Sequence, residues 1–146
     1  MKEAGATRTM KRAVNIRIES KQAEQTQTQQ AKGELYEKNG AYYLRYAEPD
    51  GEMGQTTATV KWDETHIKVI RHGDVQSDLT FRSGVRTTGG FTLPQGRLEM
   101  EMYTHGIDRK LNEGLGSLAW SYDMYTGGAH VGRIRLRLMI EEDRSE

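Results

Sequence analysis

Apolar and polar residues alternate along most of this chain, and alternation with a period of two is typical of β-strands that bury one face. The pattern is clearest at the two ends of the chain, over residues 13–19 and 133–140. In the first segment Val14, Ile16 and Ile18 share one face. In the second, isoleucine and leucine alternate with arginine and methionine. Both segments therefore predict strands with one buried and one solvated face.

Turn residues separate further segments of this kind. Asn39-Gly40 is the strongest signal, because a type I′ turn needs a positive φ at both central residues. Pro94-Gln95-Gly96 and Gly127-Gly128 are also typical of turns. The segments between the turns predict roughly nine or ten antiparallel strands in sequential hairpins, and none has the spacing of a helix. Besides the two end segments, the predicted strands cover residues 35–38, 41–46, 56–62, 66–71, 75–81, 85–93, 97–104 and 117–125.

Sequential hairpins predict an up-and-down arrangement, and closure into a barrel removes the exposed edges of such a sheet. The matching alternation at the two ends of the chain suggests that the first and last strands pair and close the ring. We therefore predict an all-β fold, a single antiparallel, lipocalin-like β-barrel of about eight to ten strands. Residues 1–11 are expected to form a disordered tail and residues 12–142 the barrel. A two-sheet sandwich is the alternative architecture.

The segment from Gln22 to Gln30 is polar on both faces, so alternation does not decide its structure. A loop, a flexible excursion and a solvated strand extension are all open. We favour a poorly buried strand that runs into Gly33, because threonine and alternating polar residues are tolerated at an edge position.

Charge and composition exclude several classes of partner. The chain has 21 Lys and Arg against 21 Asp and Glu, so its net charge of zero gives no general attraction to nucleic acid or anionic lipid. No stretch approaches the roughly 18 consecutive apolar residues of a membrane span. The basic N-terminus is not followed by the apolar segment of a signal peptide. There is no cysteine, which excludes disulfides, thiolate metal sites and a cysteine nucleophile. We expect a cytoplasmic protein that binds neither nucleic acid nor membranes.

Aromatic residues supply the most interesting candidate chemistry. Tyrosine and tryptophan combine a large apolar body with one polar group, so at a cavity wall they can both stack on a ligand and hydrogen-bond to it. Alternation places Tyr46 on one strand face, and Trp120 and Tyr122 on another. We select these three as ligand-binding candidates, with Phe81 and Met102 as apolar lining. The simpler interpretation is that all of them fill the barrel interior.

Arg71 shares a strand face with Ile67 and Val69, so it points inward if they do. An inward arginine at a barrel mouth can bind a carboxylate or a phosphate through its planar guanidinium group, and we include Arg71 among the ligand-binding candidates. A structural ion pair with Glu48 or Asp74 is the interpretation we favour, because a buried arginine needs a partner.

Other polar residues do not suggest catalysis or metal binding. The four histidines are far apart in the sequence and lack the spacing of metal ligands. Glu99 and Glu101 share one strand face, and a solvated outer face accounts for them better than an acid–base pair. Arg133, Arg135 and Arg137 form a stripe without interleaved aromatic residues, so a solvated face that protects a sheet edge is favoured over nucleic-acid binding. We therefore predict no catalytic residue, no metal ligand and no cofactor.

A series of short motifs runs through the chain. They are Tyr46-Ala47-Glu48, Ile70-Arg71-His72-Gly73, Phe81-Arg82-Ser83-Gly84, Phe91-Thr92-Leu93-Pro94-Gln95-Gly96, Trp120-Ser121-Tyr122-Asp123-Met124 and the final alternation of Ile134, Leu136 and Leu138. Their order and spacing resemble the YwiB-like family of small bacterial proteins, domain of unknown function 1934, from about Lys11 to Glu141. The family is grouped with calycin-like β-barrels, so the resemblance implies a barrel and a cytoplasmic protein. It implies no catalytic residues, because the family has no known function.

Two functional hypotheses follow, and an enzyme ranks below both because no residue pattern indicates a reaction. The first is a non-enzymatic protein whose lipocalin-like barrel binds a small amphipathic or aromatic ligand. The second is a packed barrel that acts as a protein–protein interaction module, with another protein or a second copy of itself as the partner. An empty cavity with aromatic walls would favour the first hypothesis, and a filled interior would favour the second.

Overall fold

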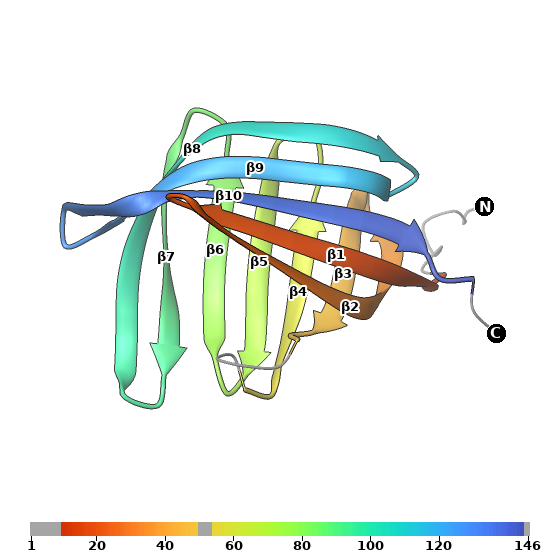
Figure 1. The fold of residues 1–146 in the computed structure, drawn as a ribbon, viewed down its shortest axis with the longest axis horizontal. Coiled ribbons are helices and arrows are strands. Elements are labelled where there is room, and N and C mark those ends of the chain that lie inside the picture. Colours follow the sequence, from red (N-terminus) through yellow and green to blue (C-terminus); the bar gives the residue numbers. More distant parts are fainter. Residues whose placement is uncertain (1–9, 50–53, 145–146) are drawn as a thin grey trace.

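The described part of the chain, residues 10–49 and 54–144 of a computed structural model, forms ten antiparallel strands in one closed barrel (Figure 1). Each strand pairs with its neighbours in the sequence, so the predicted all-β, up-and-down barrel is confirmed and the two-sheet sandwich is excluded. The strands are β1 (Arg12–Gln22), β2 (Gln25–Lys38), β3 (Ala41–Ala47), β4 (Thr56–Trp62), β5 (His66–Gly73), β6 (Gln76–Arg82), β7 (Arg86–Leu93), β8 (Gly96–Asn112), β9 (Leu115–Thr126) and β10 (Ala129–Glu142).

The first and last strands close the ring, as their matching alternation predicts. In the β1–β10 register Ile16 lies opposite Ile140, and Ile18 lies opposite Leu138. These cross-strand pairs put the apolar faces of both strands on the same, inner side of the sheet. The charged stripe on β10 therefore lies on the outer face of the sheet. β1 pairs with β10 only from Ile134 to Glu142, so within the described residues the edge at Arg133 has no partner in β1.

The polar segment Gln22–Gln30 belongs to a hairpin that the sequence pattern did not reveal. β1 ends at Gln22, Ala23 and Glu24 form the turn, and β2 begins at Gln25. The predicted poorly buried strand that runs into Gly33 is confirmed, because residues 25–30 of β2 are all exposed. The turn itself was missed because Ala23 adopts a φ of 56°, a left-handed conformation that alanine rarely occupies.

The long strands β8, β9, β10 and β1 cross the shorter strands β4–β7 in the view of Figure 1. β8 belongs to both sets, because its first half pairs with β7 and its second half with β9. The β8–β9 register shifts between Thr104 and Gly106, which marks a β-bulge at this change of partner. A second register shift lies between His130 and Gly132 on β10. Bulges bend a strand and redirect the side chain of the extra residue.

Most of the barrel interior is filled by apolar side chains. Phe81 is fully buried, and its ring centroid lies 4.6 Å from that of Tyr122 and 5.6 Å from that of Trp120. Around these rings the buried core includes Val14, Ile16, Leu35, Leu44, Ala58, Val60, Trp62, Ile67, Val69, Leu79, Met100, Met102, Leu118, Leu138 and Ile140.

The strands extend from Arg12 to Glu142. Of the predicted tail, residues 1–9 lie outside the described residues, so its disorder stays a prediction. Within the described residues, no helix is long and apolar enough to cross a membrane.

Candidate functional site

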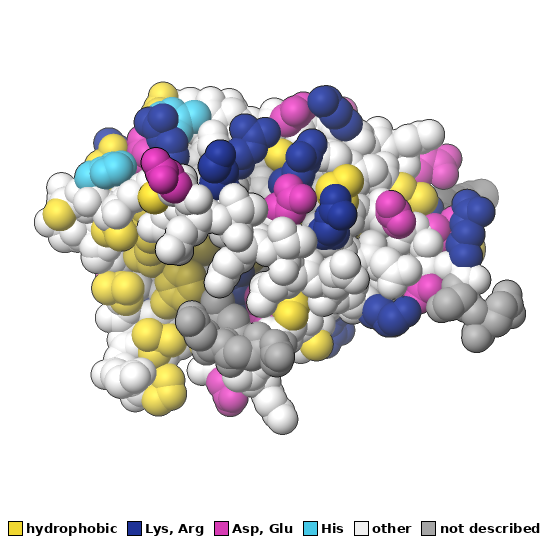
Figure 2. All heavy atoms as spheres, viewed as in Figure 1, with side chains coloured by type: hydrophobic (Ala, Val, Ile, Leu, Met, Phe, Trp, Pro, Cys, Tyr) yellow, Lys and Arg dark blue, Asp and Glu magenta, His cyan; other side chains and the backbone are white. Residues whose placement is uncertain are grey.

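The barrel interior is not filled completely, and the remaining space forms a cavity of about 420 Å³. Figure 2 shows the hollowed face of the molecule, with apolar side chains recessed below its rim. β1–β5, β9 and β10 contribute to the cavity wall, together with the segment after β3. The lining residues are Ile18, Ser20, Gln27, Gln29, Tyr46, Glu48, Pro49, Val60, Val69, Arg71, Trp120, Leu136 and Leu138.

The cavity has an apolar wall and a polar rim because of how the strands alternate. Leu136 and Leu138 of β10 continue the inward face that fills the core, and Val60 and Val69 face them from β4 and β5. Glutamines at alternate positions of β2 occupy the same face where the hairpin leaves the core. They are exposed, so the mouth of the cavity carries side-chain amides that can donate and accept hydrogen bonds.

Arg71 lies at the cavity in an ion pair with Glu48, with 2.7 Å between the Arg71 Nε and the Glu48 Oε2 atoms. The Arg71 and Glu48 side chains are only 15% and 8% exposed, so solvent screens this pair weakly. The Arg71 Nη1 group also donates to the Ser77 Oγ atom at 3.2 Å, and the guanidinium lies 6.0 Å from the Phe91 ring centroid. The ion pair with Glu48 that the sequence analysis favoured is therefore present. A guanidinium carries five N–H donors, and these two contacts leave donors for a ligand.

Two phenols and one indole provide the neutral polar groups of this region. Burial raises the pKa of Tyr46 well above the ordinary phenol value, and Glu48 raises it further while Arg71 lowers it. Burial likewise raises the pKa of Tyr122 to about 12, against a smaller lowering by Arg71. Both phenols therefore stay protonated near neutral pH.

The indole of Trp120 has an unsatisfied donor. Trp120 lines the cavity and is 3% exposed, and its buried Nε1–H group has no hydrogen-bond partner among the described residues. An unpaired buried donor costs about 1–3 kcal/mol, so an acceptor on a bound molecule or a water would be favourable at this position.

The six residues selected from the sequence separate into two groups. Tyr46, Arg71 and Trp120 line the cavity. Phe81, Met102 and Tyr122 lie in the packed core beside it. They do not line the cavity, because the interior is filled at their level. That any of the six binds a ligand stays a prediction.

Sequence analysis missed the glutamines that line the cavity. The signal that could have found them is the two-residue turn at Ala23 and Glu24, because the position of this turn determines which glutamines of β2 face inward.

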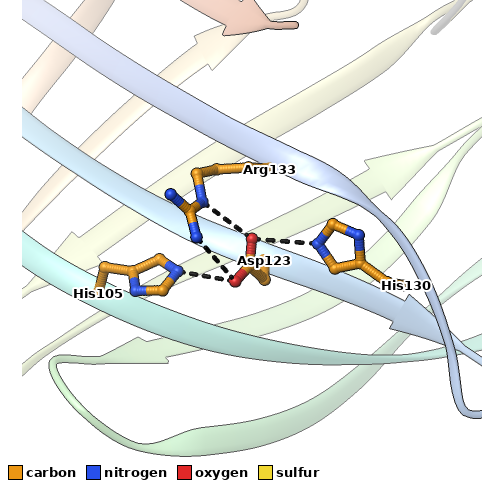
Figure 3. Close-up of polar contacts among 4 residues, drawn as sticks. All are labelled: His105, Asp123, His130 and Arg133. Carbon is orange, nitrogen blue, oxygen red and sulfur yellow. Dashed lines mark hydrogen bonds and ion pairs between the residues drawn. The ribbon is translucent and has the colours of Figure 1, made fainter.

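A second polar cluster lies on the outer face of the barrel and was also missed. Asp123 on β9 accepts hydrogen bonds from the His105 Nε2 atom at 2.8 Å and the His130 Nε2 atom at 3.2 Å (Figure 3). The Arg133 Nε and Nη2 atoms donate to the same carboxylate at 3.0 and 3.4 Å. The Asp123 side chain is 10% exposed beneath these three partners.

The cluster depends on the two bulges. His105 is the extra residue at the β8 register shift, and His130 flanks the shift on β10. Each bulge moves the pairing by one residue, so that Tyr103 and Arg133 lie directly opposite Asp123. If strand partners are assigned by counting residues back from either turn, with no allowance for a bulge, Asp123 receives the wrong partners.

The Asp123 cluster is structural in character. The hydrogen bonds from Arg133, and then those from the two histidines, hold the pKa of the Asp123 carboxyl well below its ordinary value. Figure 3 shows the two imidazoles on opposite sides of the carboxylate, with the guanidinium between them. This geometry leaves no common position for a metal ion, and no metal-binding group of three or more His, Cys, Asp or Glu residues occurs among the described residues.

Comparison with known proteins gives a consistent result. Residues 13–138 match the model of a family described as a domain of unknown function, DUF1934. The chain is 32% identical over 95 residues to the uncharacterized beta-barrel protein YwiB of Bacillus subtilis strain 168, an alignment that covers 65% of this chain and 66% of the relative. The fold matches the crystal structure of the ywiB protein from Bacillus subtilis with a TM-score of 0.84 and 23% identity. That match covers 93% of this chain and 95% of the other.

Proposed function

Because this chain belongs to the DUF1934 family, whose function is unknown, we propose from its own cavity that the barrel binds a small molecule with an apolar or aromatic body and one polar group. The observation that carries the proposal is the cavity of about 420 Å³ itself, whose lining combines apolar side chains with Tyr46, Arg71 and Trp120. This volume falls at the lower end of the roughly 300–1,000 Å³ range of small-molecule sites. The proposed ligand is therefore small.

The lining residues suggest how such a ligand would lie. Its apolar body would contact Val60, Val69 and the leucines of β10, and its acceptor would meet the Arg71 donors that Glu48 and Ser77 leave free. Glu48 already balances the charge of Arg71 at 2.7 Å, so the site favours a neutral or singly charged polar group. None of the described lining residues is an activated nucleophile, and the proposed function is binding without catalysis.

Tryptophan emission provides the test, because the chain has only two tryptophans. Trp62 is buried beside Tyr42, with 5.7 Å between their ring centroids, and it does not line the cavity. A Trp62→Phe variant therefore isolates the emission of Trp120, and a Trp120→Phe variant isolates that of Trp62. Each is titrated with N-phenyl-1-naphthylamine, an uncharged aromatic amphiphile, and with 1-anilinonaphthalene-8-sulfonate, its anionic counterpart.

We expect a saturable change in Trp120 emission in the Trp62→Phe variant, and a smaller change in Trp62 emission in the Trp120→Phe variant, because Trp62 does not line the cavity. Replacing Arg71 by methionine in the Trp62→Phe background should weaken binding of the sulfonate about tenfold and that of the neutral probe less. No saturable change with either probe, or a larger change from Trp62 than from Trp120, would contradict binding in this cavity.

A native ligand would appear as extra mass in native mass spectrometry of gently purified protein, and this extra mass would be lost when the protein is denatured.

The proposal also assumes a cytoplasmic location. Cell fractionation with an antibody against the chain tests this assumption separately.

A further inference from the structure

One edge of β2 is free although the barrel is closed. β1 pairs with β2 from Gln25 to Leu35, whereas β3 pairs with it only from Gly33 to Lys38. Within the described residues, no strand and no other backbone hydrogen bond lies along the remaining edge, residues 25–31. We call this stretch the free edge.

The two hairpin turns show which backbone groups are free. Two-residue turns connect β1 to β2 and β2 to β3, closed by the pairs Gln22–Gln25 and Lys38–Ala41. In an antiparallel sheet hydrogen-bonded pairs alternate with non-hydrogen-bonded pairs, so odd positions of β2 bond to β1 and even positions bond to β3. Both hairpins give this same assignment. At the free edge the N–H and C=O groups of the even positions, 26, 28 and 30, therefore point to solvent.

The free edge lacks the features that prevent exposed edges of natural sheets from pairing with other strands. Such edges commonly carry lysine, proline or a bulge. Residues 25–31 read QTQTQQA, with no charge and no proline, and the β1–β2 register has no shift. Residues 25–30 are all exposed. An open, uncharged edge of this kind is a template for another strand.

We propose that two copies of this chain pair antiparallel along their free edges about a twofold axis. Only even positions carry free backbone groups, so each must face an even position of the other copy. Ala47 ends β3 one residue beyond the Gly33–Tyr46 pair, which limits the overlap at that end. An axis through Gln27 meets both conditions and pairs Thr26 with the partner's Thr28.

A second copy fits this edge better than a charged peptide does. In the proposed register Gln25 faces the partner's Gln29, so no like charges meet, and glutamine side chains can hydrogen-bond along the interface. The same strand face carries Gln27 and Gln29 at the cavity rim, so the two cavity mouths would lie on either side of the axis. The inference does not depend on whether the cavity binds a ligand.

The test introduces charged side chains at the free edge. Thr26 and Thr28 are exposed, and replacing both by lysine places like charges opposite each other twice in the dimer. We expect the wild type to be a dimer of twice 16.6 kDa by sedimentation over a roughly hundredfold concentration range. The double lysine variant should raise the dimer dissociation constant about tenfold or more. A control variant, Gln76→Lys with Gln95→Lys, adds two exposed charges elsewhere and should dimerise as the wild type does.

A double variant with glutamate at both positions supplies the complementary test. Mixing it with the double lysine variant should restore a dimer, detected as a heterodimer mass in native mass spectrometry. Circular dichroism verifies that each variant is folded. A wild type that stays monomeric overturns the proposal. So does a folded lysine variant that dimerises like the wild type, because its dimer must then use another surface.

Discussion

Asp123→Asn is the most informative single substitution outside the cavity, because it removes one charge and hardly changes volume. The asparagine side chain can still accept a hydrogen bond through its oxygen, but its amide N–H groups would face donors that now bond to a carboxylate. The three partners come from β8 and β10, on either side of β9. The substitution therefore loosens the contact between three strands.

The size of this destabilisation follows from how exposed the partners of Asp123 are. The side chains of His105, His130 and Arg133 are 34%, 52% and 66% exposed, and pairs of this kind contribute about 0.2–1 kcal/mol each. Asp123 itself is largely buried, which favours the upper half of this range. We expect Asp123→Asn to lower the free energy of unfolding by about 2 kcal/mol at pH 7, or the Tm by about 4–8 °C.

The loss of stability caused by Asp123→Asn must depend on pH. The pKa of Asp123 is lowered in the folded state, while an unfolded aspartate has a pKa of about 3.9. The stabilisation is therefore complete above about pH 4 and is lost as the pH falls through the folded-state pKa. The difference in stability between wild type and variant should narrow in acid.

Urea denaturation followed by tryptophan fluorescence at pH 7, 5 and 3 measures this difference. Asp78→Asn is the matched control, since Asp78 is exposed on β6. A difference below about 0.5 kcal/mol at pH 7, or one that is as large at pH 3 as at pH 7, would refute the role given to the cluster.

Three further predictions concern stability, and denaturant titration checks each. Ala23→Gly should raise the free energy of unfolding by about 1 kcal/mol, because glycine adopts the positive φ of this turn without strain. Phe81→Ala should lower it by about 3–5 kcal/mol, since a fully buried ring is replaced by a cavity. Glu48→Gln should lower it by about 1–3 kcal/mol, less than the full cost of breaking a buried ion pair, because the amide oxygen can still accept from Arg71. An increase for Glu48→Gln, a decrease for Ala23→Gly or a change below about 1 kcal/mol for Phe81→Ala would contradict the respective argument.

The sequence predicts the strands well where alternation is regular and the turn residues are conventional. Asn39 and Gly40 have φ values of 54° and 82°, as a type I′ turn requires. The prediction ends β8 too early, at Thr104, because the bulge interrupts the alternation there while the strand continues to Asn112. The turn at Ala23 is invisible for a different reason, since alanine carries no preference for a positive φ.

The site is harder to predict than the fold. Alternation shows that Tyr46 and Phe81 both face the interior, but it does not show at which level the interior is filled. The level at which packing ends and the cavity begins depends on how the long strands cross the short ones. This crossing depends in turn on the bulges. The ion pair of Arg71 could be foreseen, because an inward arginine must find a carboxylate. The Asp123 cluster could not, because its pairing is shifted by one residue in each of two hairpins.

The seam between β1 and β10 has a consequence for synthesis of the protein. Val14 pairs with Glu142, so the contact that closes the ring joins the first strand of the barrel to its last. A nascent chain leaves the ribosome from its N-terminus, at about 5–20 residues per second. Until β10 emerges, one edge of β1 has no partner, and Ile16 and Ile18 lack their cross-strand neighbours. We expect closure of the ring to follow formation of the other strand pairs and to be slow, because the two strands that it joins are the most distant along the chain.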